Sequence, residues 1–181
     1  MRFINTTRRG RALGVLLLSM AAGAVVPVAQ ASAAHEIKPR HTLSSNQCID
    51  VPFSDLSPGR GLIEWGCNGQ NNQRFTLTST NDGYWKIVAN HSNLCLSVRG
   101  ASTANGANIE QSTCIIDPAT RLPADHQRFR LLGFGGVNYA LVAKNSGKCW
   151  DIAGANQSQG TKLQQWDCHY GDNQRFLFVW H

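Results

Sequence analysis

Three short motifs follow one another near the end of this 181-residue chain: Cys-Trp-Asp-Ile at 149–152, Gln-Trp-Asp-Cys at 165–168 and Gln-Arg-Phe at 174–176. Their arrangement decides the fold, because the same pattern of cysteines and closing motif occurs three times in the chain. In each copy two cysteines stand nineteen residues apart; the pairs are Cys48 and Cys67, Cys95 and Cys114, and Cys149 and Cys168. Each copy closes with Gln-Arg-Phe, and twenty residues lead from a closing Phe to the next first Cys. A period of about 47 residues indicates one supersecondary unit used three times.

The apolar segments inside each copy are short and separated by turn residues, which is typical of β-strands. The expected strands are residues 84–89, 95–98, 108–111 and 127–132 in the second copy, and 139–143, 149–152, 163–166 and 175–179 in the third. In the first copy we expect the opening strand at His41–Leu43. The sequence thus predicts an all-β fold of twelve strands, whose repeats (about 41–79, 84–132 and 139–181) close into a barrel around a pseudo-threefold axis.

The chain has an even number of cysteines, which indicates disulfides if it is exported, as its N-terminus (below) predicts. Six cysteines allow fifteen pairings, but only pairing within each copy treats the three copies alike and closes locally. We therefore expect one disulfide inside each repeat. Zinc is the alternative use of cysteine, and it is disfavoured because the chain has no C-x-x-C and no paired His. We expect no metal and no cofactor.

The N-terminus is typical of a secretory signal. Four arginines fall within the first eleven residues, an apolar run covers residues 12–28, and Ala31-Ser32-Ala33 has the small residues of a cleavage site. We expect residues 1–34 to be a signal peptide, cleaved after Ala33 or Ala34, and residues 35–181 to form one secreted, extracellular domain. A retained membrane anchor is the alternative, but Gly23 and Pro27 interrupt the run.

The net charge gives no support for an anionic partner. The chain is formally +6, but four arginines lie in the expected signal, and the remainder carries 13 Lys and Arg against 11 Asp and Glu. A nucleic-acid or membrane partner would need a clustered basic face. We therefore expect a monomer that binds neither nucleic acid nor, after signal cleavage, a membrane.

From about Arg40 to His181 the chain resembles the ricin B-type lectins, which are also classed as family 13 carbohydrate-binding modules. The resemblance rests on the Cys-x-Asp opening, the Trp-x-Cys of the first and third copies, and the three closing Gln-x-aromatic motifs, with Phe in place of the commoner Trp. It implies a β-trefoil fold and a shallow sugar pocket on each repeat.

The resemblance also implies which residues would bind a sugar. In repeat three the set is complete and comprises Asp151, Gln164, Trp166, Asn173 and Gln174. In repeat one it comprises Asp50, Trp65, Asn72 and Gln73, with Ile63 in place of the first Gln. Asp and Trp are fifteen residues apart in both repeats, so the two pockets share a register independently of any family name.

Repeat two departs from this pattern, with Ser97, Ser112 and His126 in place of the Asp, the Trp and the Asn. We expect binding at repeat three, weaker binding at repeat one and none at repeat two. Two roles stay open for the tryptophans, sugar platform or core residue, and two for the aspartates, sugar binding or turn capping. The closing glutamines are expected to bond the backbone first, the closing phenylalanines to be core, and Trp85, Trp150 and Trp180 to serve packing.

These features predict a non-catalytic lectin for galactose- or xylan-type saccharides. Glycosidases need two carboxylates about 5–10 Å apart, whereas each repeat supplies one Asp and no cysteine is free to act as a nucleophile. The alternative is a trefoil that binds a protein, as a protease inhibitor or a toxin or enzyme partner, through the 115–125 insertion of repeat two.

Overall fold

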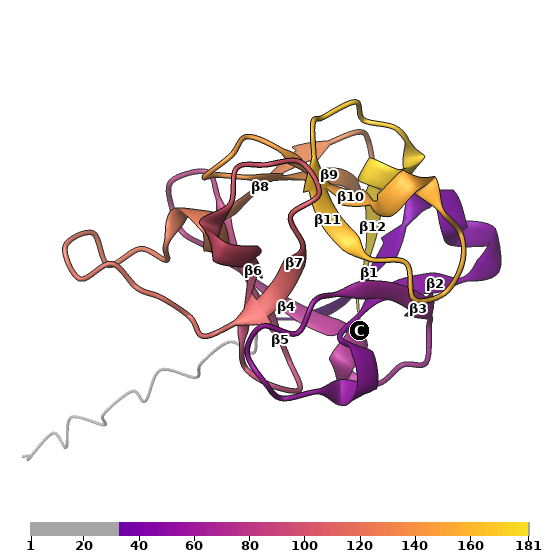
Figure 1. The fold of residues 1–181 in the computed structure, drawn as a ribbon, viewed down its shortest axis with the longest axis horizontal. Helices are drawn as coiled ribbons and strands as arrows, with labels where there is room; N and C mark the ends of the chain where they lie inside the picture. The colour runs from indigo at the N-terminus through magenta and orange to yellow at the C-terminus, as the bar shows by residue number, and fades with distance from the viewer. Residues whose placement is uncertain (1–32, 181) are drawn as a thin grey trace, which may run out of the picture. The chain divides into compact units, whose positions relative to one another are not determined.

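The computed structural model describes residues 33–180, which form twelve strands and seven short 3-10 helices (Figure 1). The expected signal peptide lies almost entirely outside the described residues. The chain divides into Met1–Gln30 and Ala31–His181, and the second unit holds the whole described fold. Among residues 33–180, no helix has both the length and the apolar character needed to span a bilayer.

Six strands form a closed antiparallel barrel in which each strand pairs with two others of the six, in the cyclic order β1-β4-β5-β8-β9-β12. These strands are β1 (Ala34–Pro39), β4 (Arg74–Ser79), β5 (Trp85–Ala89), β8 (Phe129–Gly133), β9 (Asn138–Ala143) and β12 (Phe176–Trp180). Closure leaves the barrel without an unpaired edge strand. Each repeat contributes two of the six strands, which confirms the predicted barrel and the β-trefoil fold that the resemblance implies.

The other six strands form three hairpins, one in each repeat. They are β2 (Gln47–Asp50) with β3 (Ile63–Gly66), β6 (Cys95–Val98) with β7 (Ile109–Ser112), and β10 (Cys149–Ile152) with β11 (Leu163–Trp166). The short helices are η1 (Arg40–Ser45), η2 (Pro52–Ser54), η3 (Asn71–Gln73), η4 (Arg99–Ala101), η5 (Asp125–Gln127), η6 (Ala153–Ala155) and η7 (Asp172–Gln174). Helices η2, η4 and η6 follow the first strand of each hairpin, and η3, η5 and η7 precede a barrel strand.

The core is built from equivalent positions of the three repeats. Phe75, Phe129 and Phe176, the closing phenylalanines, are fully buried, which confirms their expected core role. Trp150 is also fully buried and packs edge-on against Phe129 and Phe176. In contrast, Trp180 is 65% exposed, so it is not a core residue. It is the last described residue of β12 and contacts only the His35 ring among the described aromatic pairs.

The three disulfides pair within the repeats, as expected: Cys48 with Cys67, Cys95 with Cys114, and Cys149 with Cys168. Each links the first strand of a hairpin to the segment just after its second strand. No cysteine of the described chain is free. The cross-links therefore fix the hairpins that carry the site residues.

The opening strand of repeat one is not His41–Leu43, which lies in η1, but Ala34–Pro39. Nine positions separate the end of β1 from Cys48, whereas six separate the corresponding points of repeats two and three. A strand placed in repeat one at the spacing of the other two repeats therefore falls too close to Cys48, which is why the prediction was wrong. The first repeat also begins before residue 41, because Ala34 already pairs with Thr76.

Candidate functional site

The hairpin register brings the candidate residues of each repeat together. In repeat three Asp151 lies directly opposite Gln164, and in repeat one Asp50 lies opposite Ile63. Side chains two residues apart on a strand share a face, so Trp166 and Trp65 stand on the same face as these pairs. Asp and Trp therefore share a face in both repeats because of the hairpin register.

The Asp151 carboxylate of repeat three is held by three side-chain amides. Gln164 Nε2 donates to Oδ1 at 3.0 Å, while Asn173 Nδ2 and Gln174 Nε2 donate to Oδ2 at 2.8 and 3.0 Å. Asp151 is 3% exposed. Because a buried charge is costly unless it is hydrogen-bonded, these amides both stabilise the carboxylate and fix its direction.

The pocket of repeat three has a volume of about 350 Å³ and is lined by Asp151, Gly154, Ala155, Gln164, Trp166, His169 and Asn173. Trp166 is 41% exposed, so it is not a core residue. His169 lies at the rim, with Nε2 3.5 Å from Asp151 Oδ2. The neighbouring Tyr170 does not line the pocket and contacts the Phe134 ring. The pocket thus offers one aromatic face beside a fixed carboxylate.

In repeat one the Asp50 carboxylate has two amide donors. Gln73 Nε2 and Asn72 Nδ2 both donate to Oδ2, at 2.7 and 3.0 Å, but Ile63 has no group to donate to Oδ1. Burial raises the pKa of the Asp50 carboxyl above its usual value of 3.8, and the two amides oppose this rise. This site therefore keeps the carboxylate but has a less polar wall.

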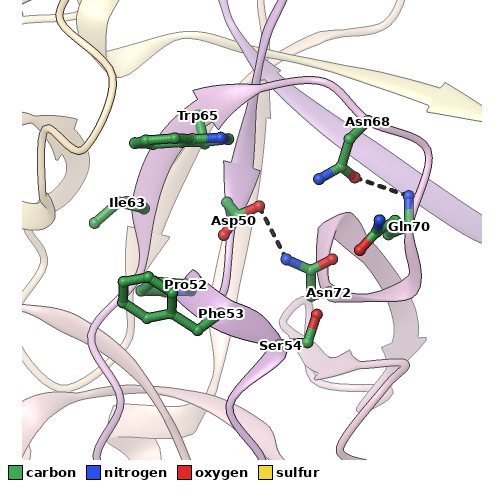
Figure 2. A pocket seen from close by; sticks show the side chains of 9 residues that line it. All are labelled: Asp50, Pro52, Phe53, Ser54, Ile63, Trp65, Asn68, Gln70 and Asn72. Atoms are coloured by element: carbon green, nitrogen blue, oxygen red, sulfur yellow. Dashed lines mark hydrogen bonds between the residues drawn. The ribbon is translucent and has the colours of Figure 1, made fainter.

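The pocket of repeat one is about 370 Å³ in volume and is lined by Asp50, Pro52, Phe53, Ser54, Ile63, Trp65, Asn68, Gln70 and Asn72 (Figure 2). Trp65 is 44% exposed and Phe53 is 92% exposed. In Figure 2 the two aromatic side chains lie on opposite sides of the pocket, with Asp50 between them.

Phe53 is the functional candidate that the sequence interpretation missed. It lies in η2 with a φ of 61°, and the equivalent residues of the other repeats, Gly100 and Gly154, have φ values of 60° and 64°. A non-glycine residue in this region costs about 1–2 kcal/mol. The signal was available in the sequence as one Phe where two aligned repeats have Gly.

Repeat two has a different arrangement at the same place. Ser97 lies opposite Glu110, whose carboxylate pairs with Arg99. Arg99 also donates to the Gly59 carbonyl of repeat one. An ion pair thus stands where repeat three has its Asp and Gln, and no aromatic side chain replaces Trp166 because Ser112 occupies that position.

Gln73 and Gln174, which the sequence assigns to sugar binding, are fully buried and do not line the pockets. The side-chain amide of Gln73 donates to Asp50 and to the Gly66 carbonyl, and that of Gln174 donates to Asp151 and to the Asp167 carbonyl. The side-chain oxygen of each glutamine accepts from a backbone N–H. Gln127 makes the equivalent backbone contacts in repeat two. Their expected backbone role is confirmed, and the two glutamines position the carboxylate from behind.

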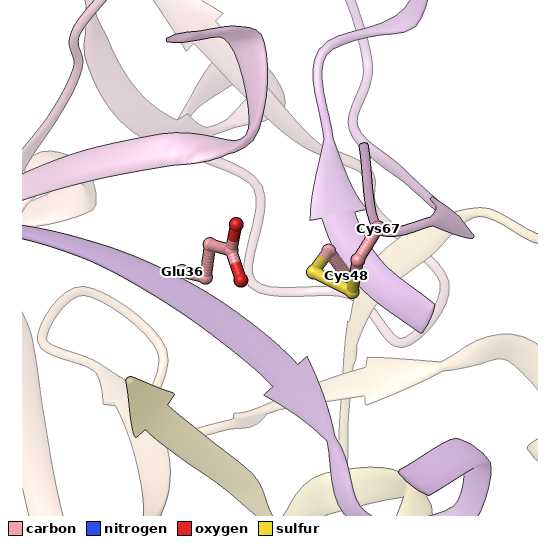
Figure 3. A group of neighbouring side chains, drawn as sticks. All are labelled: Glu36, Cys48 and Cys67. Carbon is pink, nitrogen blue, oxygen red and sulfur yellow. A yellow bond between two sulfur atoms is a disulfide. The ribbon is translucent and has the colours of Figure 1, made fainter. Parts of the chain in front are cut away.

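One group of possible metal ligands occurs among the described residues, Glu36 with Cys48 and Cys67 (Figure 3). The two sulfurs are bonded to each other, so they are not thiolates, the form of cysteine that binds metals. Glu36 lies 3.6 Å from the Lys38 ammonium. This group is therefore a disulfide beside an ion pair.

The geometry agrees with a comparison against known families. A sequence model of the ricin-type beta-trefoil lectin domain matches residues 36–176. The chain belongs to this family. The match includes all nine residues that the sequence assigns to sugar binding, and also Phe53.

This lectin domain is 37% identical over 131 residues to serine protease 1 of Rarobacter faecitabidus, a match that covers 72% of this chain and 22% of the protease. The chain thus spans about a fifth of that relative's length. A designed threefold-symmetric protein, ThreeFoil, has a TM-score of 0.72 at 35% identity, covering 81% of this chain and 97% of the design. The Macrolepiota procera ricin B-like lectin, solved with lactose, has a TM-score of 0.65 at 16% identity, covering 83% and 96%.

Proposed function

We propose that this lectin domain is a secreted, non-catalytic protein that binds galactose- or xylan-type saccharides through the pockets of repeats three and one. The observation that carries the proposal is the fixed carboxylate beside an exposed indole, which occurs in both repeats with the same register. The two pockets have similar volumes and lie in the size range of small-molecule sites.

The residue types suit a sugar. A pyranose has an apolar C–H face and a rim of hydroxyls, so an exposed indole covers the face while carboxylate and amide groups bond the rim. A hydroxyl that donates to Asp forms one of the stronger, charge-assisted hydrogen bonds. Repeat three supplies the fuller polar set because Gln164 is present, and we propose it as the main site. Repeat two lacks both the Asp and the Trp, and we propose that it does not bind.

Single shallow pockets of this kind bind weakly, on the order of millimolar, or about −4 kcal/mol. Two sites on one domain gain affinity for a polysaccharide through effective concentration. Export agrees with the three disulfides, which persist in oxidising compartments. We therefore propose that residues 1–34 direct secretion and that the domain attaches to extracellular polysaccharide.

Binding of the oxidised domain to a panel of polysaccharides and oligosaccharides tests this proposal, with Asp151→Ala and Asp50→Ala as matched variants. We expect a larger loss in Asp151→Ala, a smaller loss in Asp50→Ala, and none in Ser97→Ala of repeat two. A folded protein that retains no saccharide would refute the proposal.

The 115–125 loop of repeat two carries a second candidate function, contact with a protein. The loop extends from the barrel (Figure 1), is closed by the Ile116–Pro123 bridge, and exposes Ile115 and Ile116 by 48% and 47%. Adjacent exposed isoleucines suit a protein partner better than a sugar. Replacing both by Ser leaves saccharide binding intact under the lectin proposal and removes partner binding under this one.

A further inference from the structure

Phe53 has features that packing does not explain. It is bulky, 92% exposed, and held in the left-handed region of backbone conformation, where the aligned positions of repeats two and three have Gly. Such a residue persists against its conformational cost only where something else favours it, and residues of this kind cluster at ligand sites. The side chain lines the repeat-one pocket, so the ligand of that pocket is the natural partner.

The rest of the pocket is divided into an apolar side and a polar side. In Figure 2 the apolar half of the pocket has Trp65 above and Phe53 below, with Ile63 and Pro52 between their levels, and the polar half has Asn68, Gln70, Asn72 and Ser54. Repeat three differs at the two decisive positions, with Gln164 in place of Ile63 and Gly154 in place of Phe53. A ring bound in repeat one therefore meets apolar groups on both faces, whereas a ring bound in repeat three meets one indole.

We propose, on the basis of the lectin function above, that Phe53 forms a second aromatic wall and makes repeat one selective for pyranoses whose hydroxyls are all equatorial. Such rings, of the xylo and gluco configurations, present axial C–H groups on both faces. A galacto ring projects one axial hydroxyl from a face, and an apolar wall on that side would remove it from water without a partner. Repeat three, with its single wall, tolerates that hydroxyl.

The two sites then divide the saccharide classes between them. Repeat three remains the main site, and the share of binding that repeat one contributes is smallest with galacto-configured residues and largest with xylo- or gluco-configured ones.

The test uses the whole secreted domain with repeat three silenced by Asp151→Ala, so that repeat one is measured alone. Xylotriose, cellotriose and a galactotriose are titrated by calorimetry, and the first two separate xylo from gluco ligands. We expect the Asp151→Ala protein to prefer xylotriose or cellotriose to galactotriose. Adding Phe53→Gly should weaken binding of the preferred ligand roughly three- to tenfold and leave galactotriose nearly unchanged.

Phe53→Gly introduces the residue that the other repeats already use in this conformation, so unfolding should occur at the same or a higher temperature. Leu56→Ala is the matched control, because Leu56 is 66% exposed in the same loop and does not line the pocket. It should leave the preference unchanged.

The reciprocal variant is Gly154→Phe in the Asp50→Ala background. A Cβ added at Gly154 meets no atom within 4 Å. The φ of Gly154 is 64°, which is close to that of Phe53 in repeat one. We expect the preference of repeat three to move from galactotriose towards xylotriose.

A saccharide preference that stays unchanged after Phe53→Gly would overturn this inference and leave the lectin function intact. So would the loss of all saccharide binding in the single variant Asp151→Ala, because repeat one would then bind nothing. Failure of the wild-type domain to bind any saccharide would instead refute the proposed function.

Discussion

Asp151 and Asp50 perform the same task in different surroundings. Both are 3% exposed and accept from an Asn and a Gln that precede a barrel strand, but only Asp151 has a third amide. The sequence predicts these side chains because each follows a cysteine at fixed spacing. It does not reveal that Gln73 and Gln174 are behind the pocket, because depth depends on how η3 and η7 pack. Phe53 was missed because its signal, a Phe where the aligned repeats have Gly100 and Gly154, appears only when the three copies are compared position by position.

Removing the Asp151 carboxylate should abolish most binding at repeat three. Asp151→Asn keeps the volume but sets an amide donor against the amides of Asn173 and Gln174. Hydrogen bonds to a charged group contribute about 1.5–3 kcal/mol, so affinity should fall roughly ten- to hundredfold. Calorimetric titration in the Asp50→Ala background measures this directly. Retained affinity would show that the carboxylate does not contact the ligand.

As the pH is lowered, binding at repeat one should weaken at a higher pH than it would if Asp50 had the usual pKa of an Asp. Burial raises the pKa of Asp50 above 3.8, with the Gln73 and Asn72 amides opposing it. The carboxylate that accepts sugar hydroxyls is therefore lost as the pH falls through this raised pKa, and affinity falls with it. Titrations of the Asp151→Ala protein from pH 7 down to about pH 3.5 check the trend. An Asp50→Asn version should show no such dependence.

At the scale of elements, the junction made by repeat one differs from the junctions made by repeats two and three. Gln111 Nε2 donates to the carbonyls of Asp55 and Ser57, and Gln165 Nε2 to those of Ser102 and Ala104. The aligned residue of repeat one is Glu64, which cannot donate when ionised. The helix η1, where a strand was expected, supplies a different junction through His41.

His41 Nε2 lies 3.6 Å from Glu64 Oε2 and 3.4 Å from the Asn156 carbonyl oxygen. Burial acts to lower the pKa of His41, but Glu64 and the Asn156 carbonyl outweigh it, so the pKa is raised above 6.5. The contribution of His41 to stability is therefore complete below pH 6.5 and is lost as the pH rises through the raised pKa.

The difference in unfolding temperature between the wild type and His41→Gln should shrink as the pH is raised from about 5.5 to 8.5. Comparing the two proteins cancels the effect of His35 and His126, whose pKa values are lowered by burial. A difference that grows with pH would contradict the assigned junction.

At the scale of the whole molecule, the threefold repeat made the fold predictable. Twelve strands, a closed barrel and local disulfides all follow from one unit used three times. The repeat could not predict the features that differ between the copies. These are the longer β1–β2 connection, the ion pair of repeat two and the second aromatic wall of repeat one.

Each disulfide should contribute substantially to stability because it closes a loop with a sequence separation of 19. The chain-entropy account gives about 3 kcal/mol for a loop of this length. Replacing Cys95 and Cys114 by Ala tests this away from both proposed pockets. Guanidinium unfolding should show a loss of that order, with saccharide binding retained below the transition. A simultaneous loss of binding would show that the pockets depend on repeat two.

The central claim is that saccharides bind at the exposed indoles of repeats three and one. The most direct measurement is a titration of ¹⁵N-labelled domain with an oligosaccharide while observing the indole N–H signals of its five tryptophans. The account predicts that Trp166 and Trp65 shift, while Trp85, Trp150 and Trp180 do not. Unmoved Trp65 and Trp166 signals, with shifts confined to residues of the 115–125 loop, would contradict it.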